Sequence, residues 1–103
     1  MSESSADSLV DRALIARDEE QFESALEDLQ EALQLEPDHV QATGELAITL
    51  GQTGQLSEAI DVLNNAINRQ PADAWLLSNR AIALGLAGQF EDSIRDFDKA
   101  VTL

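Results

Sequence analysis

The sequence contains no cysteine, one histidine and only six basic residues, and each scarcity excludes a class of protein. Without cysteine the chain can form neither disulfides nor thiolate metal sites. No apolar run reaches the ~18–20 residues that a membrane-spanning helix requires. The N-terminal stretch MSESSADSLV carries an acidic residue where a secretory signal would be basic. We therefore expect a cytoplasmic protein that is neither exported nor inserted into a membrane.

Acidic residues outnumber basic residues by twenty to six, which gives a net charge of -14. This charge is uneven, because residues 6–39 carry -9, residues 40–73 carry -3 and residues 74–103 carry -1. A negative field repels nucleic acid phosphates and anionic lipid head groups. We therefore expect a protein or peptide partner that is basic or apolar, and no nucleic acid. A basic segment of the partner would dock over residues 6–39, near Asp7, Asp11 and Asp18.

The residues offer no set that favours catalysis or the binding of a metal or cofactor. His39 stands alone beside Asp38, whereas zinc or iron sites need several convergent ligands. The acidic run 18–20 and the pair Asp96 and Asp98 lack the spaced oxygens and central glycine of a calcium loop. No phosphate-binding glycine loop or Ser/His/Asp set can be argued. We expect neither an enzyme nor a cofactor.

A repeat with a period of about 34 residues organises what the sequence does contain. Pro37 and Pro71 are separated by this period, and so are Gly54 and Gly88. Eight aligned positions are identical in the second and third units. A tail of residues 1–5, expected to be disordered, precedes a single domain of residues 6–103. The units are residues 6–39, 40–73 and 74–103.

Each unit contains two helical patterns, because apolar residues recur every three or four positions. Glycine adopts the left-handed backbone at least cost, so Gly54 and Gly88 are expected to end the first helix of their units. The first unit has Glu20 in this slot, which predicts a less sharply defined turn. We also expect Gly51 and Gly85 to permit close helix approach. In the second halves the stripes are Leu56, Ala59, Ile60, Leu63, Ala66 and Ile67, then Phe90, Ser93, Ile94, Phe97, Ala100 and Val101.

This pattern resembles the tetratricopeptide repeat family, in which large residues, small residues and a proline recur at fixed places of every repeat. Arg12 and Arg80 depart from the family, which has leucine in their slot. The resemblance covers residues 6–103 and implies an all-α fold, a right-handed α-solenoid of three tandem helix-turn-helix units. The slots of the second unit hold Thr43, Leu46, Ala47, Leu50, Ala59, Leu63 and Pro71.

The resemblance also implies a concave groove, lined by the first helix of each unit, that binds a peptide or helix of a partner. Family members that bind chaperone tails use lysine, asparagine and arginine there to clamp a terminal carboxylate. The matching slots here hold Val10, Leu14, Glu45, Trp75 and Asn79, so we expect no partner ending in acids like Glu-Glu-Val-Asp. Trp75 is either a packing residue at the repeat boundary or a groove anchor. The expected groove residues are Asp7, Asp11, Leu14, Glu45, Ile48, Trp75, Asn79, Ile82 and Leu86.

The repeat places the next proline slot at position 105, beyond the last residue, Leu103. Solenoids generally end in a unit with a polar outer face, but Val101 and Leu103 are apolar and Ala100 fills a small-residue slot. Because an exposed apolar patch commonly marks an association surface, one expectation is a homodimer through these three residues. The alternative is that they belong to a longer protein in which this face is covered.

Overall fold

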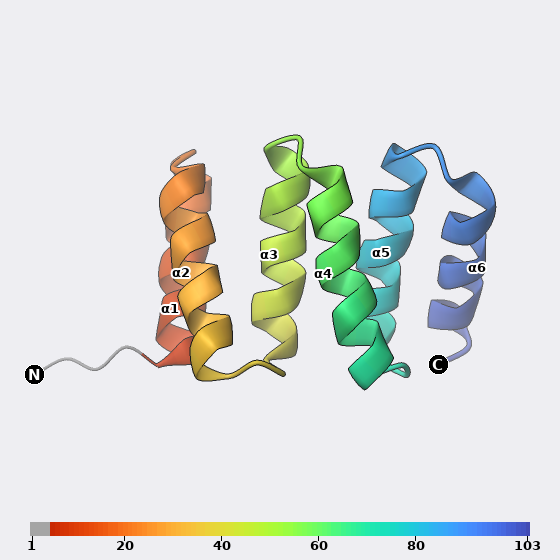
Figure 1. Cartoon of the computed structure of the whole chain (residues 1–103), viewed down its shortest axis with the longest axis horizontal. Helices are drawn as coiled ribbons and strands as arrows, with labels where there is room; N and C mark the ends of the chain where they lie inside the picture. The colour runs from red at the N-terminus through yellow and green to blue at the C-terminus, as the bar shows by residue number, and fades with distance from the viewer. Residues whose placement is uncertain (1–4) are drawn as a thin grey trace, which may run out of the picture.

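The computed structural model describes residues 5–103, which form six α-helices and no strand. The helices stand in three neighbouring pairs along an axis of 48 Å, with the first pair (residues 6–35) and the last pair (residues 74–101) at opposite ends of the row (Figure 1). This arrangement confirms the predicted all-α solenoid. Apart from Ser5, the tail predicted for residues 1–5 lies outside the described residues. The helices are α1 (Ala6–Asp18), α2 (Phe22–Leu35), α3 (Val40–Gln52), α4 (Leu56–Arg69), α5 (Ala74–Leu86) and α6 (Phe90–Val101).

The first helix of each pair begins at a side chain that caps its N-terminus, and the three caps occupy the same place in successive repeats. They are Ser5, His39 and Asp73, each accepting a hydrogen bond from the backbone N–H three residues later. Such a cap satisfies one of the unpaired N–H groups of the first turn. His39 therefore fixes the start of α3.

The turns within the pairs share one geometry. Gly54 and Gly88 have φ of 82° and 84°, which confirms their predicted left-handed conformation. In the first pair Glu20 adopts the same conformation, with φ of 61°. The N–H of Gln21 then bonds to the carbonyl of Ala16 at 2.8 Å, as its counterparts do in the other two turns. The expectation of a less defined first turn is therefore wrong, because the hydrogen bonds of the helix end hold Glu20 in a conformation that normally favours glycine.

The core lies between the helices and is built from leucines that interlock with alanines. Leu29 and Leu63, which are equivalent residues of the first two repeats, are fully buried, as are Ala25 and Ala59 in the same two helices. The small alanine side chains let neighbouring helices approach closely, and each pair gains stability by packing on the next. The result is one continuous core along the row.

Arg12 and Arg80, which depart from the family pattern, each form a bidentate ion pair with an aspartate of the following helix. Arg80 Nε and Nη2 donate to Asp96 at 2.6 and 2.8 Å. Arg12 makes the same pair of bonds to Asp28 at 2.9 and 2.8 Å. The hydrogen bonds that Arg80 donates to Asp96 raise the pKa of Arg80 above its usual value. The departure in the first helix of both units is thus compensated by an aspartate in the second helix.

Close helix approach is required at Gly44 and not at Gly51 or Gly85. A Cβ atom on Gly44 would overlap the indole ring of Trp75, which reaches from α5 onto α3. The same atom on Gly51 would lie 3.8 Å from the nearest side chain, and on Gly85 it would lie 3.4 Å away. These distances are ordinary contacts, so the expectation that Gly51 and Gly85 permit close helix approach is wrong.

Candidate functional site

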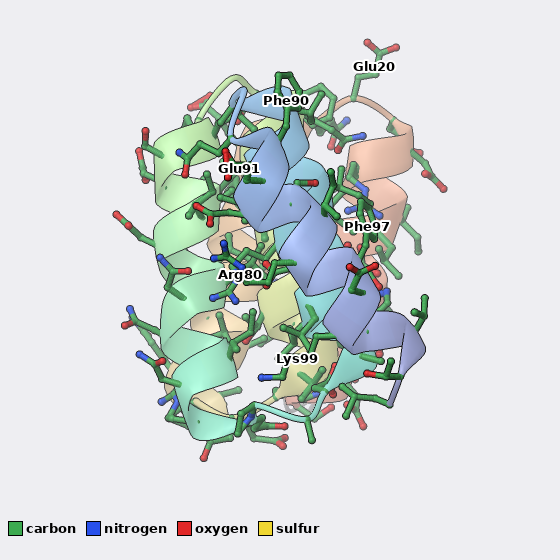
Figure 2. The ribbon with its side chains drawn as sticks, turned by 90° about the vertical axis from the view of Figure 1, so that its right-hand side faces the viewer. Glu20, Arg80, Phe90, Glu91, Phe97 and Lys99 are labelled. Atoms are coloured by element: carbon green, nitrogen blue, oxygen red, sulfur yellow. The ribbon has the colours of Figure 1, made fainter. Side chains whose placement is uncertain are left out.

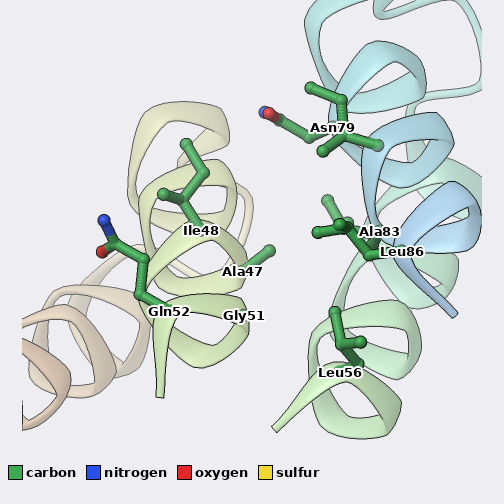
Figure 3. Close-up of a pocket in the computed structure, with 10 residues that line it drawn as sticks. Ala47, Ile48, Gly51, Gln52, Leu56, Asn79, Ala83 and Leu86 are labelled. Carbon is green, nitrogen blue, oxygen red and sulfur yellow. The ribbon is translucent and has the colours of Figure 1, made fainter. Parts of the chain in front are cut away.

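A cavity of about 450 Å³ opens between α3, α5 and the start of α4, which we call the α3–α5 pocket (Figure 3). Its wall is mostly apolar, as is typical of sites that bind an apolar side chain. Because Gly51 has no side chain, the wall on α3 stays open toward Leu56. The lining residues are Ala47, Ile48, Gly51, Gln52, Leu56, Leu63, Asn79, Ile82, Ala83 and Leu86.

Asn79 is the polar group that the pocket leaves without a partner. Its side chain points from α5 toward α3 (Figure 3), and the residue is only 9% exposed. Among residues 5–103, no group forms a hydrogen bond with its buried Nδ2 atom. Most buried polar groups are paired, because an unpaired one costs roughly 1–3 kcal/mol. The amide is therefore placed to bind a carbonyl or hydroxyl oxygen that enters the pocket.

Trp75 lies one helical turn before Asn79, at the same side of α5. Its ring packs on Gly44 of α3, so it holds the boundary between the second and third units together. The residue remains 39% exposed. Of the two alternatives for Trp75, packing at the boundary is what the structure shows. The exposed part of the ring remains available to a ligand.

Glu45, expected to be a groove acid, is neutralised by Arg17 of α1. The Arg17 Nη2 to Glu45 Oε1 distance is 2.8 Å, and both side chains are mostly buried. Arg17 Nη1 also donates to the hydroxyl of Thr49 at 3.3 Å. The ion pair is not aligned as a hydrogen bond, because Oε1 accepts none from residues 5–103. Glu45 therefore contributes a link between α1 and α3 and no unpaired charge in the groove.

Asp7 is linked to the cap of α3. Its Oδ1 atom lies 2.6 Å from Nε2 of His39, whose Nδ1 accepts the N–H of Ala42 at 3.0 Å. Since Nδ1 is an acceptor, the ring proton is assigned to Nε2, which donates to Asp7. The Asp7 side chain is nevertheless largely exposed, and so is Asp11 one turn later. These two acids form a negative surface on α1.

Four of the nine expected groove residues line the pocket, and the other five lie outside it. Ile48, Asn79, Ile82 and Leu86 line the α3–α5 pocket. Asp7, Asp11 and Leu14 lie on α1 outside the pocket, and neither Glu45 nor Trp75 lines it. Of the lining residues, sequence reasoning missed Ala47, Leu56, Leu63 and Ala83. Leu56 had a usable signal, since it begins the helix just after the Gly54 turn and so lies beside the end of α3.

The part of the chain that the structure describes has no group of three or more His, Asp or Glu side chains that could hold a metal ion. Within the same range, each helix is too short or too polar to cross a membrane.

The six helices and the pocket between them define a helical-repeat protein with an apolar hollow beside α3 and α5. The tetratricopeptide repeat family model matches residues 16–79, more than half of the chain. The chain therefore belongs to the tetratricopeptide repeat family, whose members are generally scaffolds without enzymatic activity. A comparison with curated proteins finds no match.

Solved structures share this fold at low sequence identity. MamA is 19% identical, with a TM-score of 0.84 over 95% of this chain and 57% of its own chain. The second tetratricopeptide repeat domain of Spaghetti (RPAP3), bound to the HSP90 peptide SRMEEVD, is 19% identical with a TM-score of 0.85, over 95% of this chain and 91% of that chain. The tetratricopeptide repeat domain of Sgt2 from Aspergillus fumigatus is 16% identical, with a TM-score of 0.88 over 94% of this chain and 64% of that chain. This chain spans little more than half the length of MamA.

Proposed function

We propose that this chain is a protein-interaction module that binds a peptide segment of a partner in the groove formed by α1, α3 and α5. The observation that carries the proposal is the Nδ2 atom of Asn79 in the wall of an apolar pocket, which has no hydrogen-bond partner among residues 5–103. A peptide supplies both groups that this site lacks. One apolar side chain fills the pocket, and a backbone carbonyl oxygen accepts the hydrogen bond from Asn79.

The charge of the chain selects among such peptides. The first unit carries a net charge of -9, and Asp7 and Asp11 expose carboxylates on α1. A peptide with basic residues beside its apolar residue is therefore attracted to the groove, whereas an acidic one is repelled. Arg17 of α1 is already paired with Glu45, one of the expected groove residues. An acidic terminal sequence such as that of the HSP90 peptide finds no unpaired cation there.

The test uses the intrinsic fluorescence of Trp75, the only tryptophan in the chain. Two pools of heptapeptides with a fixed central leucine, one with basic and one with acidic flanks, are titrated beside the peptide SRMEEVD. We expect the basic pool to bind and change the Trp75 emission, while the acidic pool and SRMEEVD do not. Asn79→Ala should weaken binding of the basic pool about 2- to 10-fold, the value of one neutral hydrogen bond.

Two further variants separate loss of the pocket from a general effect of a surface charge. Ile82→Asp introduces a charge into the pocket at a half-exposed position and should abolish binding. The matched control is Ile15→Asp, at a similarly exposed position of α1 outside the pocket. It should bind as the unmodified chain does. The proposal is wrong if neither pool binds, or if both variants weaken binding equally.

A second candidate function, self-association through the third unit, is supported by a different surface. Val101 and Leu103 are exposed at the end of the row. Ala100, in contrast, is half-buried against the core. Large apolar side chains elsewhere on α6 are also exposed, among them Phe90 and Ile94. Light scattering across a dilution series tests this function: a mass that rises with concentration supports it, and a strict monomer excludes it.

A further inference from the structure

Four exposed apolar side chains form a continuous stripe along α6, which we call the α6 stripe: Phe90, Ile94, Phe97 and Val101. They recur at spacings of four, three and four residues, so they lie on one side of the helix. Figure 2 looks onto this end of the molecule, where Phe97 projects from one side of α6 and Lys99 from the other. The buried side of α6 is separate, because Ser93 and Asp96 face the core.

The internal repeat shows what such a stripe normally contacts. In the middle unit the residues equivalent to Phe97 and Val101 are Leu63 and Ile67, which are 0% and 5% exposed because α5 packs beside α4. Phe97 and Val101 are 40% and 81% exposed. The α6 stripe is therefore a helix-packing surface that no helix of the described residues covers.

The spacing of the stripe suits an antiparallel copy of itself. When two α6 helices run in opposite directions about a two-fold axis, Phe90 of one copy faces Val101 of the other, and Ile94 faces Phe97. Both pairings are centred on the same two-fold axis, because the spacing of four, three and four residues is the same in both chain directions. In coiled-coil terms, each layer sets an a position against a d position, as antiparallel helix pairs do. A two-fold contact of this kind closes after two copies.

The opposite end of the row offers a smaller apolar surface, because Ile15 and Leu35 are the exposed large apolar side chains of α1 and α2. The hollow between α1 and α2 is lined mainly by polar and charged side chains, including Arg12, Glu19 and Glu27. That unit also carries a net charge of -9, against -1 for the third unit. A head-to-tail contact would bury these charges, whereas a two-fold contact through α6 joins the least charged units and keeps the acidic units apart.

The stripe is also large enough for a specific contact. Its four side chains are 40–81% exposed, and a complete aromatic side chain has ~150–250 Å² of surface, so the stripe presents on the order of 500 Å² of apolar surface per copy. Two copies would bury about 1,000 Å² in total, the lower bound for a specific interface. We propose that a second copy of this chain covers the α6 stripe, with the two α6 helices antiparallel and Ile94 packed against Phe97 of the other copy.

This geometry rests on the self-association proposed above and adds an electrostatic signature. Glu91 and Asp98, both exposed, flank the stripe on the same side of α6. In the antiparallel pair Glu91 of one copy lies close to Asp98 of the other, and the contact occurs twice by symmetry. Like charges at such positions oppose association. Asp98→Lys replaces both repulsions with attractions and should therefore tighten the dimer, an effect that misfolding cannot mimic.

The test measures the dissociation constant of the dimer by sedimentation velocity for the whole chain and its variants. We expect Asp98→Lys to lower this constant about tenfold, as two surface charge contacts change sign. Ile94→Asp should raise it by at least tenfold, because a buried charge replaces an apolar contact. Ile15→Asp, at the opposite end of the row, is the matched control and should leave it unchanged.

Because the chain has no cysteine, a disulfide can report the register. A mixture of Ile94→Cys and Phe97→Cys copies should link mainly as the mixed dimer on mild oxidation, while Ile15→Cys should not link. A strict monomer excludes self-association altogether. The antiparallel α6 contact is wrong if Ile15→Asp disrupts the dimer, if Ile94→Asp leaves it intact or if Asp98→Lys weakens it. Each of these results would still show that the chain self-associates. Peptide binding in the α3–α5 pocket is unaffected by either result.

Discussion

Glu20 holds the backbone position that glycine occupies in the other two turns. Its φ of 61° lies in the left-handed region, which costs an L-residue with a side chain roughly 1–2 kcal/mol. The N–H of Gln21 still bonds to the carbonyl of Ala16 at 2.8 Å, so the helix end and the packing of α2 on α1 impose this conformation. Glu20 also places a negative charge at the C-terminal end of α1, where the helix dipole disfavours it.

Glu20→Gly keeps the bond between Gln21 and Ala16 and removes the backbone strain, while the added freedom of the unfolded chain offsets part of the gain. We expect the free energy of unfolding to rise by about 1 kcal/mol, measured from urea denaturation. Gly54→Ala is the converse control and should lower it by about 1 kcal/mol, since φ there is 82°. An unchanged or less stable Glu20→Gly protein would show that the turn is not strained.

The contact between Gly44 and Trp75 gives a second prediction at the scale of single residues. In Gly44→Ala the new methyl group overlaps the indole ring, so Trp75 must move away from α3. The loss of packing is offset by the ~1 kcal/mol gain in helix propensity, so stability should change by less than about 1 kcal/mol. We expect the Trp75 emission to shift to longer wavelength and acrylamide to quench it more strongly.

Gly51→Ala is the matched control for this experiment, because a methyl group fits there in ordinary contact with Leu56. It should raise stability by about 1 kcal/mol and leave the Trp75 emission unchanged. Equal emission spectra for Gly44→Ala and the unmodified chain would contradict the contact between Trp75 and α3.

At the scale of helices, one contact between the first and second helix of a unit is charged in one repeat and apolar in another. The third unit has Arg80 and Asp96 there, and the middle unit has Leu46 and Val62 in the same slots. Arg80 Nη1 also donates to Asn64 of α4 at 3.0 Å, so its ion pair joins three helices. A charged pair and an apolar pair thus serve the same packing position in one chain.

Asp96→Val alone leaves the Arg80 guanidinium largely buried without its partner, and we expect it to lower the free energy of unfolding by about 3 kcal/mol. The double variant Arg80→Leu with Asp96→Val reproduces the apolar pair of the middle unit. It should be within about 1 kcal/mol of the unmodified chain, because well-packed apolar residues replace a buried ion pair at little cost. Urea denaturation of both variants measures the difference. Equal losses for the single and double variants would show that the ion pair itself is what stabilises the third unit.

The sequence predicted the helices well because their signals are local and repeated. Helix ends follow from Gly54 and Gly88, and the repeat period assigns the remaining elements by comparison. The contacts between units were harder to predict, because they depend on residues distant in sequence. No local pattern indicates that Gly44 packs on Trp75, because the two residues belong to different units. Similarly, Glu45 was expected to be a groove residue, but its ion pair with Arg17 of α1 joins two units and has no local signal in the sequence.

At the scale of the whole molecule, the two proposed surfaces respond to charge in opposite ways. The groove adjoins the first unit, with a net charge of -9, and is expected to attract a basic peptide. The α6 stripe brings together two copies that each carry -14. Salt weakens attraction and repulsion alike, and the Debye length falls from ~10 Å at 0.1 M to ~3 Å at 1 M.

Raising the sodium chloride concentration from about 0.05 M to about 0.5 M should therefore weaken the binding of the basic peptide pool and tighten the dimer. Peptide binding is measured with Ile94→Asp, which keeps the groove but disrupts the α6 contact, and dimerisation with Ile82→Asp, which keeps α6 but blocks the pocket. We expect the peptide dissociation constant to rise about tenfold and the dimer dissociation constant to fall severalfold over this range. Asp98→Lys, which removes the repulsion across the stripe, should make the dimer less sensitive to salt. If both constants move in the same direction, the assignment of the two surfaces to an attractive and a repulsive contact is incorrect.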